Sequence, residues 1–321
     1  GGFLYMIVLN KKTIRIFVFG IFVLLFYIGF GYGQVNMRYA DVGVDNARIT
    51  IRVVQPAVSQ SQKATHNREQ ALNNAELNLY RMVSLANVKE TPADIVIYPE
   101  TSYPFVIMPD DDFEFVRQIG RPVIMGANSI DDDGRIRNSM AIIGMDGKLQ
   151  HIYSKSHLVP FGEYRPLGFL PASIDLAPGD GPENLNVNGL HFVPAICYEI
   201  IFSDSLIPDG AGVVDAIVNI TNDGWFGNTP GTYQHLDMVR RYAIESGLPI
   251  VRANYSGISA FVSSDGEIVS MLPVGSTGVL DGMVWGAHKT PYRIIGRDGW
   301  MIIILMFSCV CAIVFARRDE F

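Results

Sequence analysis

The sequence predicts an α/β protein in which helices and a mixed β-sheet form a layered sandwich. One observation is a strand over residues 49–54, followed by a helix over residues 63–87 and a second strand over residues 94–98. Another is a pair of turn signals, Asp146-Gly147 and Ser264-Asp265-Gly266, each flanked by apolar runs. Because βαβ units give parallel strands and tight turns give antiparallel pairs, together they predict a sheet of mixed direction.

The remaining elements continue this pattern along the chain. An amphipathic helix is predicted over residues 232–246, with Gly247 as its C-cap. No repeat, low-complexity tract or linker divides residues 34–298, so we expect one domain there. Further strands are predicted over residues 122–127, 139–143, 190–196, 213–220 and 249–253.

Two apolar stretches flank this domain. Residues 14–33 have about the length of a helix that crosses a bilayer, and residues 300–316 lie at the short end of that range. A buried core helix is the alternative for each stretch. Basic residues precede the first stretch and follow the second, namely Lys11, Lys12, Arg15, Arg317 and Arg318.

This distribution of charge predicts that both ends of the chain are cytoplasmic. We therefore expect an N-terminal membrane segment over residues 1–33 and a domain over residues 34–298 on the far side of the membrane. Residues 299–321 would form a C-terminal transmembrane helix and a cytoplasmic tail. The chain also begins without methionine, which suggests the C-terminal piece of a longer membrane protein.

The composition argues against several classes of function and leaves one cysteine in the domain. The net charge of -7, without a basic patch rich in aromatic residues, argues against a nucleic-acid partner. The six histidines show no paired spacing typical of metal ligands, so we expect neither a metal nor another cofactor. Of the three cysteines, Cys309 and Cys311 lie in the second apolar stretch, which leaves Cys197 alone in the domain.

Cys197 follows the predicted buried strand over residues 190–196 and is followed closely by the carboxylate of Glu199. A strand end holds a sulfur rigidly, and the turn beyond it can direct a backbone N–H at a developing oxyanion. Cys197 is thus a candidate nucleophile. A lone cysteine near a strand is also common as simple core packing, so this residue alone does not decide between the two.

Two further residues are candidates by their position. Glu100 directly follows an apolar strand, where an unpartnered carboxylate is costly, and is a candidate general base. A helix-capping or ion-paired glutamate is the alternative. Lys155 lies in a loop after an apolar run, and by itself an ordinary solvated lysine is the alternative there.

Together these residues carry a family resemblance. Glu100 in Tyr-Pro-Glu, Lys155 in Lys-Ser-His-Leu-Val-Pro-Phe-Gly-Glu and Cys197 in Cys-Tyr-Glu resemble the Glu-Lys-Cys triad of the nitrilase, or carbon-nitrogen hydrolase, superfamily. Segments 157–163 and 196–201, with Ile-Thr-Asn-Asp-Gly-Trp-Phe-Gly from residue 220, resemble the apolipoprotein N-acyltransferase family within it. The resemblance implies a four-layer αββα nitrilase-like sandwich flanked by transmembrane helices.

The resemblance also implies the roles of the triad. Glu100 would be the base that takes the thiol proton of Cys197. The Lys155 ammonium and the Tyr198 backbone N–H would stabilise the oxyanion.

Other motif residues have implied supporting roles. Glu163 and Glu199 would be supporting carboxylates that orient Lys155 and the incoming amine, with a surface or helix-start charge as the alternative. Trp225, Phe226 and His235 would be substrate-binding. The two aromatic residues would form the pocket wall, and His235 would have a structural or positioning role.

The implied reaction has two stages. A phospholipid, chiefly phosphatidylethanolamine, donates an acyl chain to Cys197 and leaves a thioester. The N-terminal amine of a diacylglyceryl-modified lipoprotein cysteine then accepts the acyl group. Because both substrates reside in the membrane, we expect the protein in the bacterial inner membrane, with its catalytic domain on the periplasmic side. We also expect apolar loops over residues 103–108 and 167–171 near the pocket.

The sequence departs from the family pattern in two ways. Residues 60–67 hold no tryptophan where the family commonly has one, and the larger N-terminal helix bundle is missing. The nearest alternative is a membrane-tethered nitrilase-type amidase that hydrolyses a small carbon-nitrogen substrate. A catalytically inactive sandwich that serves as a binding module is the other, and the presence of all three triad residues speaks against it.

Overall fold

The computed structural model describes residues 20–25, 28–29, 49–57, 68–88, 93–168, 171–202, 205–227 and 229–316. The chain divides into two compact units, residues 1–45 and 46–321. In the first unit the described residues, 20–25 and 28–29, are helical, and the rest of the expected span over residues 14–33 lies outside the described residues. The second unit holds the sheets and the candidate site.

One sheet of the second unit has its strands in the order β13-β1-β2-β4-β5-β6, with β3 also paired to β4. Neighbours among β1, β2, β3 and β4 are parallel, whereas β5, β6 and β13 pair antiparallel. The strands are β1 (Thr50–Gln55), β2 (Ile95–Ile97), β3 (Val106–Ile107), β4 (Val123–Ile130), β5 (Ile136–Ile143), β6 (Leu149–Ser154) and β13 (Gly278–Met283).

The other sheet has the order β12-β11-β10-β9-β8-β7, with β8, β9 and β10 parallel and the remaining neighbours antiparallel. Its strands are β7 (Leu185–Val187), β8 (Leu190–Ile196), β9 (Ala216–Thr221), β10 (Ile250–Asn254), β11 (Ser259–Val262) and β12 (Ile268–Leu272). Both sheets therefore mix a parallel βαβ part with hairpins, which confirms the predicted mixed direction.

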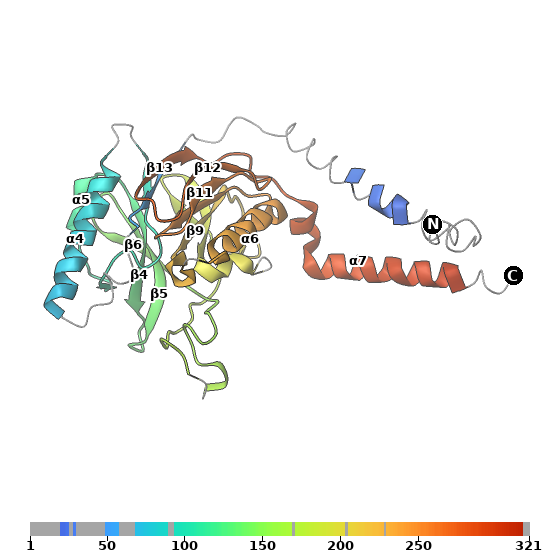
Figure 1. The fold of residues 1–321 in the computed structure, drawn as a ribbon, viewed down its shortest axis with the longest axis horizontal. Coiled ribbons are helices and arrows are strands. Elements are labelled where there is room, and N and C mark those ends of the chain that lie inside the picture. Colours follow the sequence, from blue (N-terminus) through green and yellow to red (C-terminus); the bar gives the residue numbers. More distant parts are fainter. Residues whose placement is uncertain are drawn as a thin grey trace. The chain divides into compact units, whose positions relative to one another are not determined.

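The helices cover the outer faces of the two sheets, and Figure 1 shows α4 and α5 on one side of the strands and α6 on the other. They are α4 (Arg68–Ala86), α5 (Glu114–Ile119) and α6 (Gly231–Ser246). One buried cluster joins the facing sides of the sheets, for example Ile97 with Ile196. A second joins the first sheet to α4 and α5, and a third joins the other sheet to α6. These three apolar layers give the expected αββα order.

A buried ion pair closes the first sheet. The Arg52 side chain on β1 is fully buried, and its Nε and Nη2 atoms donate to the Asp281 carboxylate on β13 at 2.8 and 2.9 Å. Its Nη1 donates to the Ala86 carbonyl at the end of α4. Thr50 pairs with Met283 in this sheet, so the segments before β1 and after β13 leave it at the same end.

Several element boundaries agree with the sequence prediction. Strand β8 covers the predicted residues 190–196, and α6 begins one residue before the predicted helix. Gly247 has φ 67 and donates its N–H to the Ala243 carbonyl, which confirms it as the C-cap. Strand β9 begins at Ala216 and not at Val213, because Val213 is exposed and no strand pairs with it. The part of the predicted helix over residues 63–67 lies outside the described residues.

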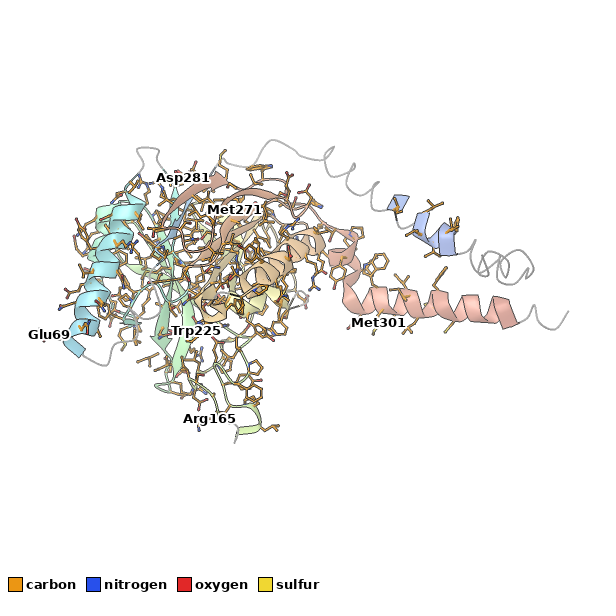
Figure 2. All side chains as sticks on the ribbon, viewed as in Figure 1. Glu69, Arg165, Trp225, Met271, Asp281 and Met301 are labelled. Carbon is orange, nitrogen blue, oxygen red and sulfur yellow. The ribbon has the colours of Figure 1, made fainter. Side chains whose placement is uncertain are left out.

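The C-terminal helix is α7 (Pro291–Ala316), which is broken at Gly296. Its side chains from Met301 to Phe307 are apolar and exposed, and Figure 2 labels the first of them. No helix within the described residues is long and apolar enough to cross a membrane. The tail over residues 317–321 lies outside the described residues.

We predict that Arg52→Met lowers the free energy of unfolding by about 3 kcal/mol, because it leaves the Asp281 carboxylate and the Ala86 carbonyl without their buried donor. Chemical denaturation followed by circular dichroism measures this change. Arg117→Met is the matched control, since Arg117 makes exposed ion pairs with Asp112 and Glu114 and should change stability little. Equal stability of the two variants would contradict the prediction.

Candidate active site

Glu100 lies in the turn after β2, where a close approach of β4 fixes the backbone. A Cβ atom on Gly126 of β4 would lie 2.5 Å from the Glu100 Cα and 2.6 Å from the Thr101 nitrogen. Only glycine lets the two segments come this close, and the Gly126 N–H donates to the Pro99 carbonyl at 3.2 Å. The Glu100 carboxylate is 5% exposed, so β4 holds it at a defined position in the interior.

Lys155 lies at the end of β6 and is fully buried among carboxylates. Its Nζ donates to Glu163 Oε1 at 2.8 Å and lies 3.9 Å from Glu100 Oε1. The other oxygen of Glu163 accepts the Val159 N–H at 2.8 Å, which ties the loop after β6 to the lysine. Lys155 is therefore no solvated surface residue, and Glu163 has the place expected of a carboxylate that orients it.

Asn138 on β5 joins the two carboxylates, and the sequence analysis missed it. Its Nδ2 donates to Glu100 Oε1 at 2.7 Å and to Glu163 Oε1 at 3.3 Å. Its backbone carbonyl accepts the Lys155 N–H at 2.8 Å. The available signal was a polar residue next to the predicted buried strand over residues 139–143, which also fits an ordinary strand end.

Cys197 is the first residue of the 3₁₀ turn η2 (Cys197–Ile201), directly after β8. Its φ of 51 is in the left-handed region, which costs a residue with a Cβ about 1–3 kcal/mol. Such a conformation persists only where the surrounding structure imposes it, and it is typical of functional sites. The residue as a whole is partly exposed, and it lines the cavity described below.

The three expected catalytic residues influence each other's protonation. Burial raises the pKa of Cys197 to about 12, with the Glu100 carboxylate adding to the rise and Lys155 opposing it. Burial also raises the pKa of Glu100 above its usual range, against Lys155 and the Asn138 hydrogen bond. Burial alone would lower the pKa of Lys155, but Glu100 and Cys197 outweigh it and raise that pKa. The lysine thus keeps its charge while Glu100 and Cys197 compete for a proton.

One oxygen of Glu100 is free to accept that proton. Its Oε1 is engaged by Asn138, whereas its buried Oε2 has no hydrogen-bond partner among the described residues. A buried acceptor without a partner is costly in a purely structural site. The arrangement suits general-base chemistry on the neighbouring thiol.

Glu199 has a different place from the one expected. It is fully buried and does not line the cavity. Its carboxylate accepts the Tyr153 hydroxyl at 2.9 Å, the Ser156 N–H at 2.7 Å and the Ile196 N–H at 2.8 Å. It therefore links the loop after β6, which begins at Lys155, to the end of β8, which Cys197 follows.

A cavity of about 600 Å³ opens over these residues. Its floor is polar, whereas most of its wall is aliphatic or aromatic, as is common for ligand pockets. Trp225, which is labelled in Figure 2, is 72% exposed and lines the cavity together with Tyr198. No group of metal-ligating side chains is found within the described residues. Apolar lining residues include Ile136, Val159, Ile174, Leu176, Ile201, Phe226 and Met238, and polar ones include Glu100, Thr101, Asn128, Asn138, Lys155, Glu163, Ser173, Asn222, Gln234 and His235.

His235 lies below the Cys197 turn in a buried polar network. Its Nε2 is 3.2 Å from the Cys197 carbonyl oxygen, and its Nδ1 is 2.8 Å from Asp223 Oδ1. Asp223 also accepts a hydrogen bond from Arg252 at 2.8 Å. Burial alone would raise the pKa of the Asp223 carboxyl, but Arg252 and His235 outweigh this effect and lower the pKa to about 2. Phe226 packs edge-on against the His235 ring.

The sequence analysis missed Asp223 and Arg252. Asp223 appeared only within the motif segment that starts at residue 220. Arg252 was available as a charge within the predicted buried strand over residues 249–253, where a lone cation requires a partner.

Comparison with known proteins identifies the family. The family model "Carbon-nitrogen hydrolase" matches residues 50–284. The chain belongs to the carbon-nitrogen hydrolase family. Of the solved structures, it is similar to a CN-hydrolase superfamily protein from Xanthomonas campestris at 17% identity and TM-score 0.56, over 74% of this chain and 91% of the other. It is also similar to Nit3 of Saccharomyces cerevisiae at 17% identity and TM-score 0.58, over 74% and 90%. At this identity the two structures show the fold alone.

Within the family, the chain is similar to proteins named apolipoprotein N-acyltransferase, as the motifs predicted. The protein of this name from Agrobacterium fabrum is 35% identical over 92% of this chain and 60% of its own length. That from Brucella suis is 32% identical over 93% of this chain and 60% of its own length. The chain thus spans less than two thirds of each of these relatives.

We predict that Lys155→Met slows alkylation of Cys197 by iodoacetamide near neutral pH by about tenfold or more. Lys155 lowers the pKa of the Cys197 thiol, so its removal should raise that pKa further. At a fixed pH below the pKa, the fraction of reactive thiolate then falls tenfold for each unit by which the pKa rises. The curve of alkylation rate against pH should move to higher pH. Lys148→Met, a surface substitution, is the control, and a curve that stays in place or moves to lower pH would contradict the prediction.

Proposed function

We propose that this chain carries the catalytic domain of an apolipoprotein N-acyltransferase, which acylates the N-terminal diacylglyceryl-cysteine of lipoproteins. The observation that supports it most is the meeting of Glu100, Lys155 and Cys197 on the floor of one largely apolar cavity. The relatives of that name support the choice of reaction within the family.

In the first stage, Glu100 takes the thiol proton as the Cys197 sulfur attacks the carbonyl carbon of a phospholipid ester. The Lys155 ammonium and the Tyr198 N–H stabilise the oxyanion of the tetrahedral intermediate. The carbon–oxygen bond to the glycerol then breaks, and Glu100 returns its proton to the leaving oxygen. The products are an acyl thioester on Cys197 and a lysophospholipid.

In the second stage, the lipoprotein α-amine attacks the thioester carbonyl. Glu100 takes a proton from the attacking amine, the carbon–sulfur bond breaks, and the sulfur leaves as a thiolate that recovers the proton from Glu100. The acyl group is then held in an amide bond. The raised pKa of Glu100 suits it to carry this proton in both directions.

The cavity wall supports a lipid substrate over a small polar one. Ile174, Leu176, Ile201 and Met238 line the space above the triad, and burying an acyl chain against them removes apolar surface from water. A small amide would leave most of this wall unfilled. Phosphatidylethanolamine is the acyl donor we propose.

We also propose that the domain works at the bacterial inner membrane, on its periplasmic side. The exposed apolar side chains of α7 from Met301 to Phe307 support contact with lipid. The shared exit of the two flanking segments beside Thr50 and Met283 suits attachment of both to one membrane surface.

The first experiment is mass spectrometry of the Cys197 peptide after incubation of the membrane-embedded chain with phosphatidylethanolamine and no acceptor. We expect a fatty acyl group on Cys197 that hydroxylamine removes, and a matching amount of lysophospholipid. Cys197→Ala is the control, because it should fold and carry no acyl group.

Two results would contradict the proposal. Acyl-enzyme that still accumulates in Cys197→Ala would exclude Cys197 as the nucleophile. A folded wild-type chain that leaves Cys197 unmodified by lipid, yet releases ammonia from small amides, would favour the membrane-tethered amidase.

A further inference from the structure

The Cys197 carbonyl oxygen makes a contact that the reaction scheme above does not use. It lies 3.2 Å from His235 Nε2. We propose that His235 is a positioning residue whose Nε2–H holds this carbonyl and thereby directs the Tyr198 N–H toward the oxyanion. The inference rests on the proposed function for the identity of the acyl donor, but not for the geometry.

A carbonyl oxygen only accepts hydrogen bonds, so the contact requires a proton on His235 Nε2. The other ring nitrogen faces both Asp223 Oδ1 at 2.8 Å and Arg252 Nη2 at 3.2 Å. A protonated Nδ1 donates to Asp223, and an unprotonated one accepts from Arg252. The Nε2 proton is present in the neutral ring that accepts from Arg252 at Nδ1 and in the doubly protonated ring, but not in the neutral ring that carries its proton on Nδ1. We assign His235 to one of the first two states, because only these let Nε2 donate to the Cys197 carbonyl.

The peptide plane carries the effect from His235 to the site. A trans peptide is planar, and its C=O and N–H point to opposite edges. A bond that fixes the Cys197 carbonyl therefore also fixes the direction of the Tyr198 N–H. This peptide needs such a restraint, since Cys197 has a left-handed φ and its peptide opens a 3₁₀ turn in which the first N–H groups have no intrahelical acceptor.

The ring itself is held on several sides. Asp223 Oδ2 accepts from Arg252 at 2.8 Å and from Asn254 Nδ2 at 2.7 Å, and Arg252 Nη1 donates to Asn219 on β9. All of these side chains are at least 97% buried. A rigid network of this kind keeps the carbonyl restraint in place before substrate binds, as oxyanion stabilisation requires.

His235 is not placed to act as the base. Its Nε2 is directed at the backbone oxygen of Cys197, and its Nδ1 is enclosed by Asp223 and Arg252. Glu100 in contrast retains a free oxygen among the described residues. The two groups thus have separate tasks, proton transfer for Glu100 and backbone orientation for His235.

Two substitutions of His235 distinguish the contribution of Nε2 from that of Nδ1. His235→Gln places an amide nitrogen near the Nε2 position and keeps a donor for the carbonyl, whereas His235→Asn reaches only as far as Nδ1. We measure acylation of Cys197 by a long-chain p-nitrophenyl ester and by phosphatidylethanolamine, together with alkylation by iodoacetamide. Alkylation passes through no oxyanion, so it reports thiol reactivity alone.

We expect His235→Asn to slow acylation by about a hundredfold through the turnover rate, with KM and the alkylation rate near wild type. His235→Gln should recover most of the loss. Acylation by His235→Asn at the wild-type rate, no recovery in His235→Gln, or a parallel loss of alkylation would each overturn the inference.

The nitrophenyl ester allows the role of His235 to be tested independently of the proposed phospholipid donor. If the wild type is acylated by this ester but not by phospholipid, the proposed function fails, and the comparison of the two variants still decides the role of His235. A folded wild type acylated by neither donor overturns both.

Discussion

The structure of the site depends on one buried ammonium group held between two carboxylates. Lys155 is fully buried, and it lies 2.8 Å from Glu163 and 3.9 Å from Glu100. Removing each charge from water costs several kcal/mol, which is recovered only if partners and hydrogen bonds are in place. Asn138 supplies part of that compensation by donating to both carboxylates. The ends of β2, β5 and β6 must therefore meet in one arrangement, and this arrangement leaves one Glu100 oxygen free for a proton.

Cys197, the proposed nucleophile, is held by a second polar network on the other sheet. Cys197 adopts a backbone conformation that is unfavourable in isolation, at the end of β8, which pairs parallel with β9 and antiparallel with β7. Glu199 fixes the N–H of Ile196 just before it, and His235 lies against its carbonyl. The first sheet thus provides the acid–base groups and the second provides the sulfur. The cavity forms where the two sheets bring these groups together.

The same architecture accounts for the choice among reactions of the family. The Glu-Lys-Cys set serves acyl transfer to water and to amines equally, so it does not distinguish an amidase from an acyltransferase. The apolar surface of the cavity and the exposed Trp225 support the substrate with a hydrocarbon chain that we propose. Because β1 and β13 are antiparallel neighbours, the start of β1 and the end of β13 lie side by side at one end of their sheet.

Local sequence patterns were enough to predict many of the elements and the order of the candidate site residues along the chain. The strand that ends at Ile196, the cysteine after it and the glycine that closes α6 at Gly247 all follow from local patterns of apolar spacing and backbone preference. Which polar groups meet, in contrast, is set by the fold. The contact of Asn138 with two carboxylates and the close approach of Gly126 to the Glu100 turn both depend on strand pairings across long stretches of chain. Local periodicity carries no information on such pairings, because register is set by the packing of a whole sheet.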